Sequence, residues 1–246
     1  MSRILFEVCT EGVDGVLAAA EAGAQRVELC ASLFTGGLGP SPGVVAEACC
    51  VPGVEVMCMV RPRAGDFCFT DAELRGMLAD IGAYKAAGAA GVVFGVLSPD
   101  GTVDEARTAL LVERARPLSV TFHRAFDVTR DPYDALDALL RLGVDRVLTS
   151  GQRATAPEGA PLIAELVRRS AGRLTVLPGC GITPDNVGAL VRSTGVREVH
   201  ATAFAKTDSP MRHRNPEVYM GAPGLEESER QVTSAAEVGR MLAALP

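Results

Sequence analysis

The chain has 246 residues, a formal net charge of −6 and a sequence pI near 5.2. This acidic balance argues against general nucleic-acid binding, which favours a basic surface. No apolar run approaches the ~20 residues that cross a bilayer, and residues 1–15 lack the long apolar region of a secretion signal, so we expect a cytoplasmic protein with no membrane segment.

Short apolar runs typical of buried parallel strands recur along the whole chain. Helical patterns, with apolar residues three and four positions apart, lie between them, for example at residues 71–88 and 131–143. In chain order the strand-like runs are ILFEVC, RVELC, VEVMCMVRPR, GVVFG, LSVTFHRAF, RVLTSG, RLTVLPGCGI and REVHAT.

Four glycines mark the places where predicted helices end and strands begin. They are Gly23, Gly88, Gly143 and Gly195, separated by 65, 55 and 52 residues, and glycine readily takes the left-handed conformation that closes a helix. Each spacing holds about two strand–helix units, since one strand–helix–strand motif takes ~30 or more residues. The sequence therefore predicts a single α/β domain over residues 1–246, a (β/α)8 TIM barrel. An open doubly wound sheet is the alternative.

The segment after the last predicted strand has no periodic pattern. We expect a long loop at residues 206–227, followed by a C-terminal helix at about 228–245. Loops longer than ~15 residues usually serve a site or a partner. This loop is therefore a candidate lid or subunit contact, and a solvated mobile loop is the alternative.

The residues that close the predicted strands are unusually polar, and a barrel of this kind places its chemistry at these carboxyl ends. Two-residue spacing on a strand puts both side chains on one face, as for Glu7 with Cys9 and Glu28 with Cys30. The polar residues form either a functional site or a network of mutually neutralising charges. The other members of the set are Arg61, Arg63, Asp66, His123, Arg124, Asp127, Ser150 and His200.

The seventh predicted strand ends in a glycine-rich turn that contains Gly179 and Gly181. A turn of this type presents backbone N–H groups, and the loops after strands seven and eight are the usual phosphate site of a barrel. The turn is therefore a candidate anion-binding loop, although a tight strand-to-helix turn requires glycine in any case.

Eight segments, taken in order, resemble the CutC copper homeostasis proteins: EVC, RVELC, GGLGPSPG, VRPRAGDF, VTFHRAFD, RVLTSG, PGCGIT and MRHRN. The resemblance implies a cytoplasmic (β/α)8 barrel that forms a homo-oligomer, a dimer or tetramer, is associated with copper tolerance and binds Cu(I). In the family the suggested copper ligands are the cysteines of the EVC and ELC segments, which here are Cys9 and Cys30. Soft thiolates select Cu(I) over harder ions, in agreement with that pair.

Copper binding leaves the charged groups of the mouth unexplained, so the alternative function is an enzyme that acts on a small carboxylated or phosphorylated metabolite. His123 is the candidate general acid or base, because an unperturbed histidine exchanges protons near ~pH 6.5. Asp127 or one of the glutamates, Glu7 and Glu28, would orient it, and His200 is the second candidate. The candidate ligands of the anion are Arg61, Arg63, Asp66, Arg124, Ser150, Gly179 and Gly181.

Overall fold

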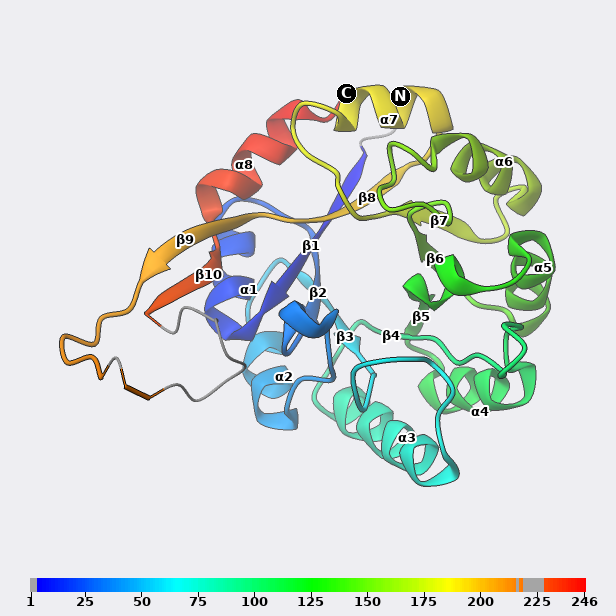
Figure 1. The fold of residues 1–246 in the computed structure, drawn as a ribbon, viewed down its shortest axis with the longest axis horizontal. Helices are drawn as coiled ribbons and strands as arrows, with labels where there is room; N and C mark the ends of the chain where they lie inside the picture. The colour runs from blue at the N-terminus through cyan, green and yellow to red at the C-terminus, as the bar shows by residue number, and fades with distance from the viewer. Residues whose placement is uncertain (1–3, 216, 219–227) are drawn as a thin grey trace.

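The computed structural model describes residues 4–215, 217–218 and 228–246, and its first eight strands form one parallel sheet (Figure 1). Strands β1 to β7 are neighbours in chain order, and β8 pairs with the other side of β1. The strands are β1 (Leu5–Glu11), β2 (Arg26–Cys30), β3 (Glu55–Met59), β4 (Gly91–Phe94), β5 (Ser119–Phe122), β6 (Arg146–Thr149), β7 (Thr175–Pro178) and β8 (Glu198–Thr202).

The ring closes between β7 and β8. A parallel bridge joins Gly179, directly after β7, to His200 in β8. Figure 1 shows the strands at the centre and the helices arranged around them. The strand order confirms the predicted (β/α)8 barrel and excludes the open doubly wound sheet.

Helices alternate with the strands and cover the outside of the barrel (Figure 1). Side-chain hydrogen bonds cap the first turns of two of these helices. Thr70 and Glu73 form a reciprocal capping box at the start of the helix from Asp71, and Ser41 caps the helix that begins at Pro42. The described helices are α1 (Gly12–Glu21), α2 (Pro42–Cys49), α3 (Asp71–Ala86), α4 (Glu105–Ala115), α5 (Pro132–Leu142), α6 (Ala160–Ser170), α7 (Val187–Thr194) and α8 (Ala235–Ala244), with short 3-10 helices η1 (Leu33–Thr35) and η2 (Arg124–Val128).

The four glycines that marked the strand–helix repeat all have left-handed backbones. The φ angles of Gly23, Gly88, Gly143 and Gly195 lie between 68° and 89°. Residues with a Cβ atom rarely adopt this conformation. The predicted helix ends are therefore confirmed.

The barrel strands separate two apolar clusters. The larger one packs between the sheet and the helices and includes Val8 and Leu29. The smaller one lies on the opposite, inward face of the strands, because successive side chains alternate across a strand. Its buried members are Cys9, Cys30, Met57, Met59 and Val93.

The C-terminal part differs from the expected boundaries. Strand β9 (Phe204–Asp208) pairs antiparallel with β10 (Glu229–Thr233), and Figure 1 shows this hairpin extending away from the barrel. The first residues of the expected loop therefore belong to β9, and β10 precedes the helix α8 that was expected from about residue 228. The two strands are short and their residues are mostly exposed or half-buried, so they lack the apolar alternation that identifies a strand. Residues 216 and 219–227 of the expected loop lie outside the described residues.

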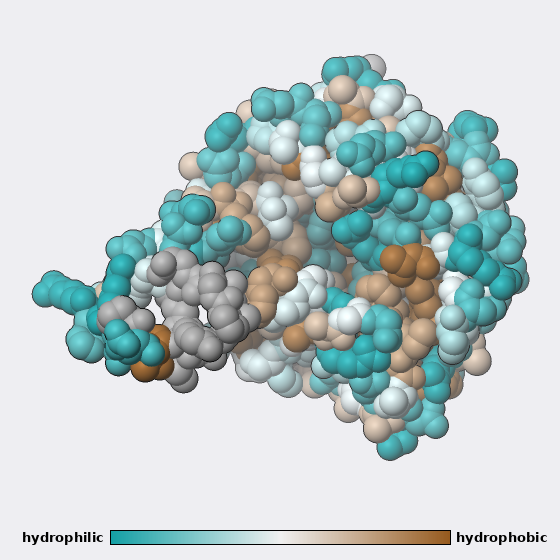
Figure 2. Space-filling model, in the orientation of Figure 1, coloured by the Kyte–Doolittle hydropathy of each residue, from teal (hydrophilic) through white to brown (hydrophobic). Residues whose placement is uncertain are grey.

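None of the described helices combines the length and the apolar character that a bilayer crossing requires. The space-filling view in the same orientation shows hydrophobic residues interspersed with hydrophilic ones (Figure 2).

Candidate functional site

Two cysteines and a glutamate from the first two strands meet inside the barrel. Cys9 on β1 lies opposite Glu28 on β2, and Cys30 lies two residues further along β2 on the same face. Both sulfurs are 3.4 Å from Oε2 of Glu28, and all three side chains are buried. One ligand atom from each residue lies within 4.8 Å of the others, so the group could hold a metal ion.

His200 on β8 extends this cluster. Its Nδ1 is 2.8 Å from Oε1 of Glu7, and its Nε2 is 3.8 Å from Oε2 of Glu28. Glu7, Glu28 and His200 form a second group whose ligand atoms lie within 4.8 Å of one another. The fold thus brings together five of the polar residues that the sequence placed near the strand ends: Glu7, Cys9, Glu28, Cys30 and His200.

The two cysteines differ in acidity. The hydrogen bond from Cys30, with a further contribution from His200, lowers the pKa of Cys9 to about 5 although burial opposes ionisation. The same hydrogen bond, together with burial, raises the pKa of Cys30 well above its ordinary value. Burial also raises the pKa of Glu28 well above its ordinary value. Near neutral pH, Cys9 is therefore a thiolate, whereas Cys30 and Glu28 hold their protons more tightly than an ordinary thiol or carboxyl group does.

Glu7 and His200 form a charged pair beside this thiolate. Burial opposes the ionisation of Glu7, but the hydrogen bond to His200 and the charge of Arg26 outweigh it and lower its pKa to about 2. Burial also opposes a charged His200, yet the acidic groups around its ring, Glu28, Cys9 and Glu7, raise its pKa well above the ordinary value. An anionic carboxylate and an imidazolium therefore lie next to the cysteines.

A buried ionic network occupies the starts of β2, β6 and β8. Nε of Arg26 lies 2.5 Å from Oε2 of Glu7, and the same guanidinium contacts Glu198. Nε of Arg146 lies 2.7 Å from Oε2 of Glu198. Buried charges require partners of opposite sign, and here every member has one. The network fixes the carboxylate of Glu7 that bonds to His200.

Arg26, Arg146 and Glu198 were not among the residues that the sequence singled out. A spacing signal was available, because Arg26 precedes Glu28 by two residues and Glu198 precedes His200 by two. Residues two apart on a strand share a face, so both would have been placed on the inward side.

Arg61 follows β3 and is buried in the mouth, with 7% of its surface exposed. Its Nη1 donates to the carbonyls of Thr35 and Gly37 at 3.3 and 3.2 Å, and its Nη2 donates to Gly65 at 2.8 Å. Its Nε is buried and has no hydrogen-bond partner among the described residues. The guanidinium also lies over the ring of Phe67, 4.9 Å from its centre.

Arg63 and Asp66 lie on the same loop but nearer to solvent. Arg63 pairs with Asp66 at 3.0 Å and with Glu73 of α3 at 2.7 Å. It also donates to the carbonyl of Cys68 at 2.9 Å. These contacts hold the loop after β3 against the start of α3.

His123 directly follows β5 and is 4% exposed. Its Nδ1 accepts the backbone N–H of Ala125 at 3.1 Å, and its ring centre is 4.9 Å from that of Phe67. Burial, followed by the charge of Arg61, lowers the pKa of His123 to about 3. The ring is therefore neutral, and its buried Nε2 has no hydrogen-bond partner in the described part of the chain.

Asp127 organises the loops after β5 and β6 rather than contacting His123. Its carboxylate accepts from Nε of Arg124 at 2.8 Å and from the hydroxyl of Thr149 at 2.5 Å. It also accepts from the backbone N–H of Ser150 at 2.9 Å. Nη2 of Arg124 in turn donates to the hydroxyl of Ser150 at 2.9 Å.

The glycine turn after β7 packs against the loop after β6. A Cβ on Gly181, whose φ is +69°, would lie 2.7 Å from Cγ2 of Thr155. A Cβ on Gly179 would lie 2.6 Å from Cδ1 of Leu148 and 3.2 Å from the ring of His200. Close packing therefore accounts for both glycines, and a role in anion binding stays a prediction.

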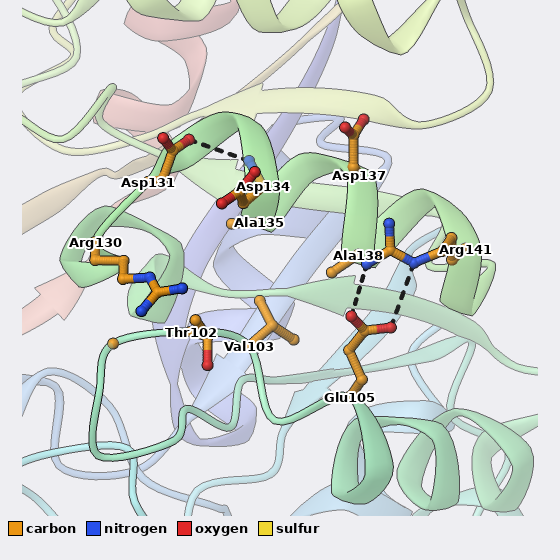
Figure 3. A pocket seen from close by; sticks show the side chains of 11 residues that line it. Thr102, Val103, Glu105, Arg130, Asp131, Asp134, Ala135, Asp137, Ala138 and Arg141 are labelled. Carbon is orange, nitrogen blue, oxygen red and sulfur yellow. Dashed lines mark hydrogen bonds and ion pairs between the residues drawn. The ribbon is translucent and has the colours of Figure 1, made fainter.

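A cavity of about 260 Å³ lies outside the barrel, between α4 and α5 (Figure 3). Its lining is charged, and several of its charged groups have partners within the chain. Arg141 pairs with Glu105 at 2.6 Å, Arg130 pairs with Asp100 at 3.1 Å, and Asp131 caps α5. This cavity contains none of the residues expected to carry the function.

The model of the CutC family matches residues 4–205. The chain belongs to the CutC family. A CutC family protein of Mesorhizobium japonicum is 52% identical over 226 residues, which are 92% of this chain and 88% of the relative. The copper homeostasis protein cutC homolog of Mus musculus is 46% identical over 218 residues, 89% of this chain and 80% of the relative.

Solved structures agree with this assignment. A crystal structure of CutC from Streptococcus agalactiae has a TM-score of 0.77 and 33% identity, covering 81% of this chain and 98% of that one. Phosphoribosyl anthranilate isomerase from Thermotoga maritima superimposes with a TM-score of 0.57 at 12% identity, covering 98% of each chain. The second likeness shows the shared barrel fold alone.

Proposed function

We propose that this CutC family protein binds Cu(I) through Cys9 and Cys30. The observation that carries the proposal is the meeting of two buried sulfurs on adjacent strands, each 3.4 Å from the same carboxyl oxygen of Glu28. Thiolates are soft ligands that favour Cu(I), as they do zinc, over hard ions. Copper homeostasis in the name of the mouse relative supports the same ion.

The charges on the cysteines and on His200 suit the binding of a soft monovalent cation. Cys9 is already ionised near neutral pH, and Cys30 gives up its proton when the metal arrives, since the thiolate is the metal ligand. Two thiolates and one Cu(I) carry a net charge of −1. The imidazolium of His200 beside Cys9 compensates this charge without entering the ligand set.

Glu28 and Glu7 have separate roles in this proposal. Glu28 lies between the two sulfurs, and its Oε1 is buried without a hydrogen-bond partner among the described residues, so it is the candidate third ligand or proton acceptor. Glu7 holds Nδ1 of His200 and thereby fixes the orientation of the ring, as second-layer carboxylates do at metal sites.

A competition assay tests the two ligands. The reduced, metal-free chain is loaded with Cu(I) and titrated with a chromophoric Cu(I) chelator. We expect the wild-type chain to retain about one ion against a chelator concentration that strips a Cys9→Ser, Cys30→Ser double variant, because serine oxygen is a hard ligand.

The matched control removes two cysteines at the C-terminal end of α2. A Cys49→Ser, Cys50→Ser double variant should retain copper as the wild type does, because these side chains lie outside the barrel interior. Equal retention by the Cys9→Ser, Cys30→Ser variant would rule out the proposed site.

A further inference from the structure

Arg61 differs from every other arginine that is buried or half-buried in the described ranges. Among the described residues it has no carboxylate partner within ion-pair distance, and its hydrogen bonds there go only to neutral backbone carbonyls. A buried cation without a counter-charge is costly. Each of the other such arginines has a carboxylate partner: Arg26, Arg63, Arg107, Arg116, Arg124 and Arg146.

His123 supplies an unused donor next to this cation. Its Nδ1 accepts the N–H of Ala125, so the single proton of the neutral ring is on Nε2. That N–H is buried and finds no acceptor in the described part of the chain. Buried donors in native proteins are nearly always satisfied, and an orphaned one calls for an explanation.

The two groups contact the same aromatic ring. The guanidinium of Arg61 and the imidazole of His123 each lie 4.9 Å from the centre of the Phe67 ring. His123 directly follows β5 and Arg61 lies two residues after the end of β3, so both lie at the carboxyl end of the barrel. Barrel enzymes and binding proteins place their ligands at this end.

We infer that Arg61 and His123 form a binding site for a small oxyanion, the carboxylate or phosphate group of a small molecule. One such group supplies the negative charge that Arg61 lacks and an acceptor oxygen for Nε2–H of His123. Arginine matches both kinds of oxyanion because its N–H groups form a planar fork. A neutral histidine donates to the anion without exchanging a proton with it.

This oxyanion site is separate from the proposed copper ligands, but one loop segment, Gly36 and Gly37, lies close to both. A Cβ on Gly36 would lie 3.1 Å from Nη1 of Arg61, and one on Gly37 would lie 3.2 Å from the sulfur of Cys30. The same two-residue segment therefore passes over both groups, and its glycines leave room for them. The oxyanion site uses neither cysteine, so the inference does not rest on copper binding.

Nuclear magnetic resonance of the histidine side chains tests the inference on the unmodified chain. The protein has 3 histidines, so a ¹⁵N-histidine sample gives few signals, and a His123→Gln variant assigns the relevant one. Reduced, metal-free protein is titrated with inorganic phosphate or with acetate at constant ionic strength, with chloride as the reference salt. We expect a saturable shift of the His123 Nε2–H signal.

The two anions distinguish the ligand class. A response to phosphate alone indicates a phosphorylated ligand, a response to acetate alone indicates a carboxylate, and a response to both indicates a general oxyanion site. No saturable shift with either anion overturns the inference, and this result requires no variant that might misfold.

Substitution of Arg61 provides a second test of the oxyanion site. Arg61→Gln should weaken anion binding about tenfold or more, the loss expected for one charge-assisted hydrogen bond. Arg116→Gln is the matched control, because Arg116 also ties loops together through backbone carbonyls and is not at the mouth. Unchanged anion affinity in a folded Arg61→Gln protein overturns the inference, as does an equal loss in Arg116→Gln.

Discussion

Cys9 and Cys30 show how far residue spacing predicts a site. Their pairing with Glu28 follows from two facts available in the sequence: two-residue spacing places side chains on one face, and sequential strands of a barrel are neighbours. Both facts are local. The acidity of the two thiols was not predictable in this way, because it depends on one hydrogen bond between them and on His200, which comes from the last barrel strand.

The ion partners of the arginines were the least predictable residue-level feature. Arg26 contacts Glu198, 172 positions away in the chain, and Arg124 contacts Asp127, only three away. The sequence does not show whether an arginine pairs with a carboxylate that is near in the chain or with one that is distant. For the same reason the sequence does not indicate that Arg61 lacks a carboxylate partner among the described residues.

His123 makes the stability of the protein depend on pH. The unfolded chain takes up a proton near pH 6.5, whereas the folded ring resists protonation down to a pKa of about 3. Between these values the unfolded state binds more protons, so the free energy of unfolding falls as the pH decreases. The contribution is complete above pH 6.5 and decreases by up to ~1.4 kcal/mol per pH unit below it.

Urea denaturation between pH 7.5 and 4 measures this contribution as the difference between wild type and His123→Gln. We expect the wild type to lose stability more steeply than the variant. His213→Gln, at an exposed position, should follow the wild-type pH dependence. Parallel curves for wild type and His123→Gln would contradict a buried neutral histidine.

The elements of the barrel followed from sequence more reliably than the loops. Buried strands and glycine-terminated helices carry strong periodic and conformational signals, and these segments appear where they were expected. The β9–β10 hairpin carries no such signal because nearly all of its residues are exposed or half-buried. The expected oligomeric assembly, the cytoplasmic location and the subunit-contact role of the segment from residue 206 stay predictions.

Loop packing after β6 depends on a close approach of two glycines. A Cβ on Gly159 would lie 1.9 Å from the carbonyl oxygen of Ser150 and 2.8 Å from Cα of Gly151. Gly159→Ala should therefore lower the free energy of unfolding by about 1–3 kcal/mol, since backbone must move to admit the methyl group.

Gly76→Ala is the matched control for this change. Gly76 lies inside α3, and a Cβ there meets nothing within 4 Å, so alanine should stabilise the protein by about 0.5–1 kcal/mol. Chemical denaturation compares the two variants. A Gly159→Ala protein as stable as the wild type would show that the loops do not pack as described.

At the scale of the whole molecule, the ionic network at the strand starts links distant parts of the barrel. Glu198 on β8 contacts Arg26 on β2 and Arg146 on β6, so one carboxylate serves two buried or half-buried cations. The closing of the ring made this network possible; local spacing places Arg26 and Glu198 on the inward face but does not indicate that they pair.

Glu198→Gln should lower the free energy of unfolding by about 3 kcal/mol, because two guanidinium groups lose their shared counter-charge. Glu105→Gln is the control: it breaks an exposed pair with Arg141 and should cost less than about 1 kcal/mol. Thermal and urea unfolding of both variants measure the difference. Equal small costs would mean that the inner network contributes no more than a surface ion pair.

X-ray absorption at the copper edge tests the proposed metal centre most directly. The Cu(I)-loaded wild-type chain should show two sulfur ligands, and the Cys9→Ser, Cys30→Ser variant loaded under the same conditions should lose that sulfur shell. A wild-type spectrum with only nitrogen and oxygen ligands, or a sulfur shell that persists in the double variant, would contradict the account.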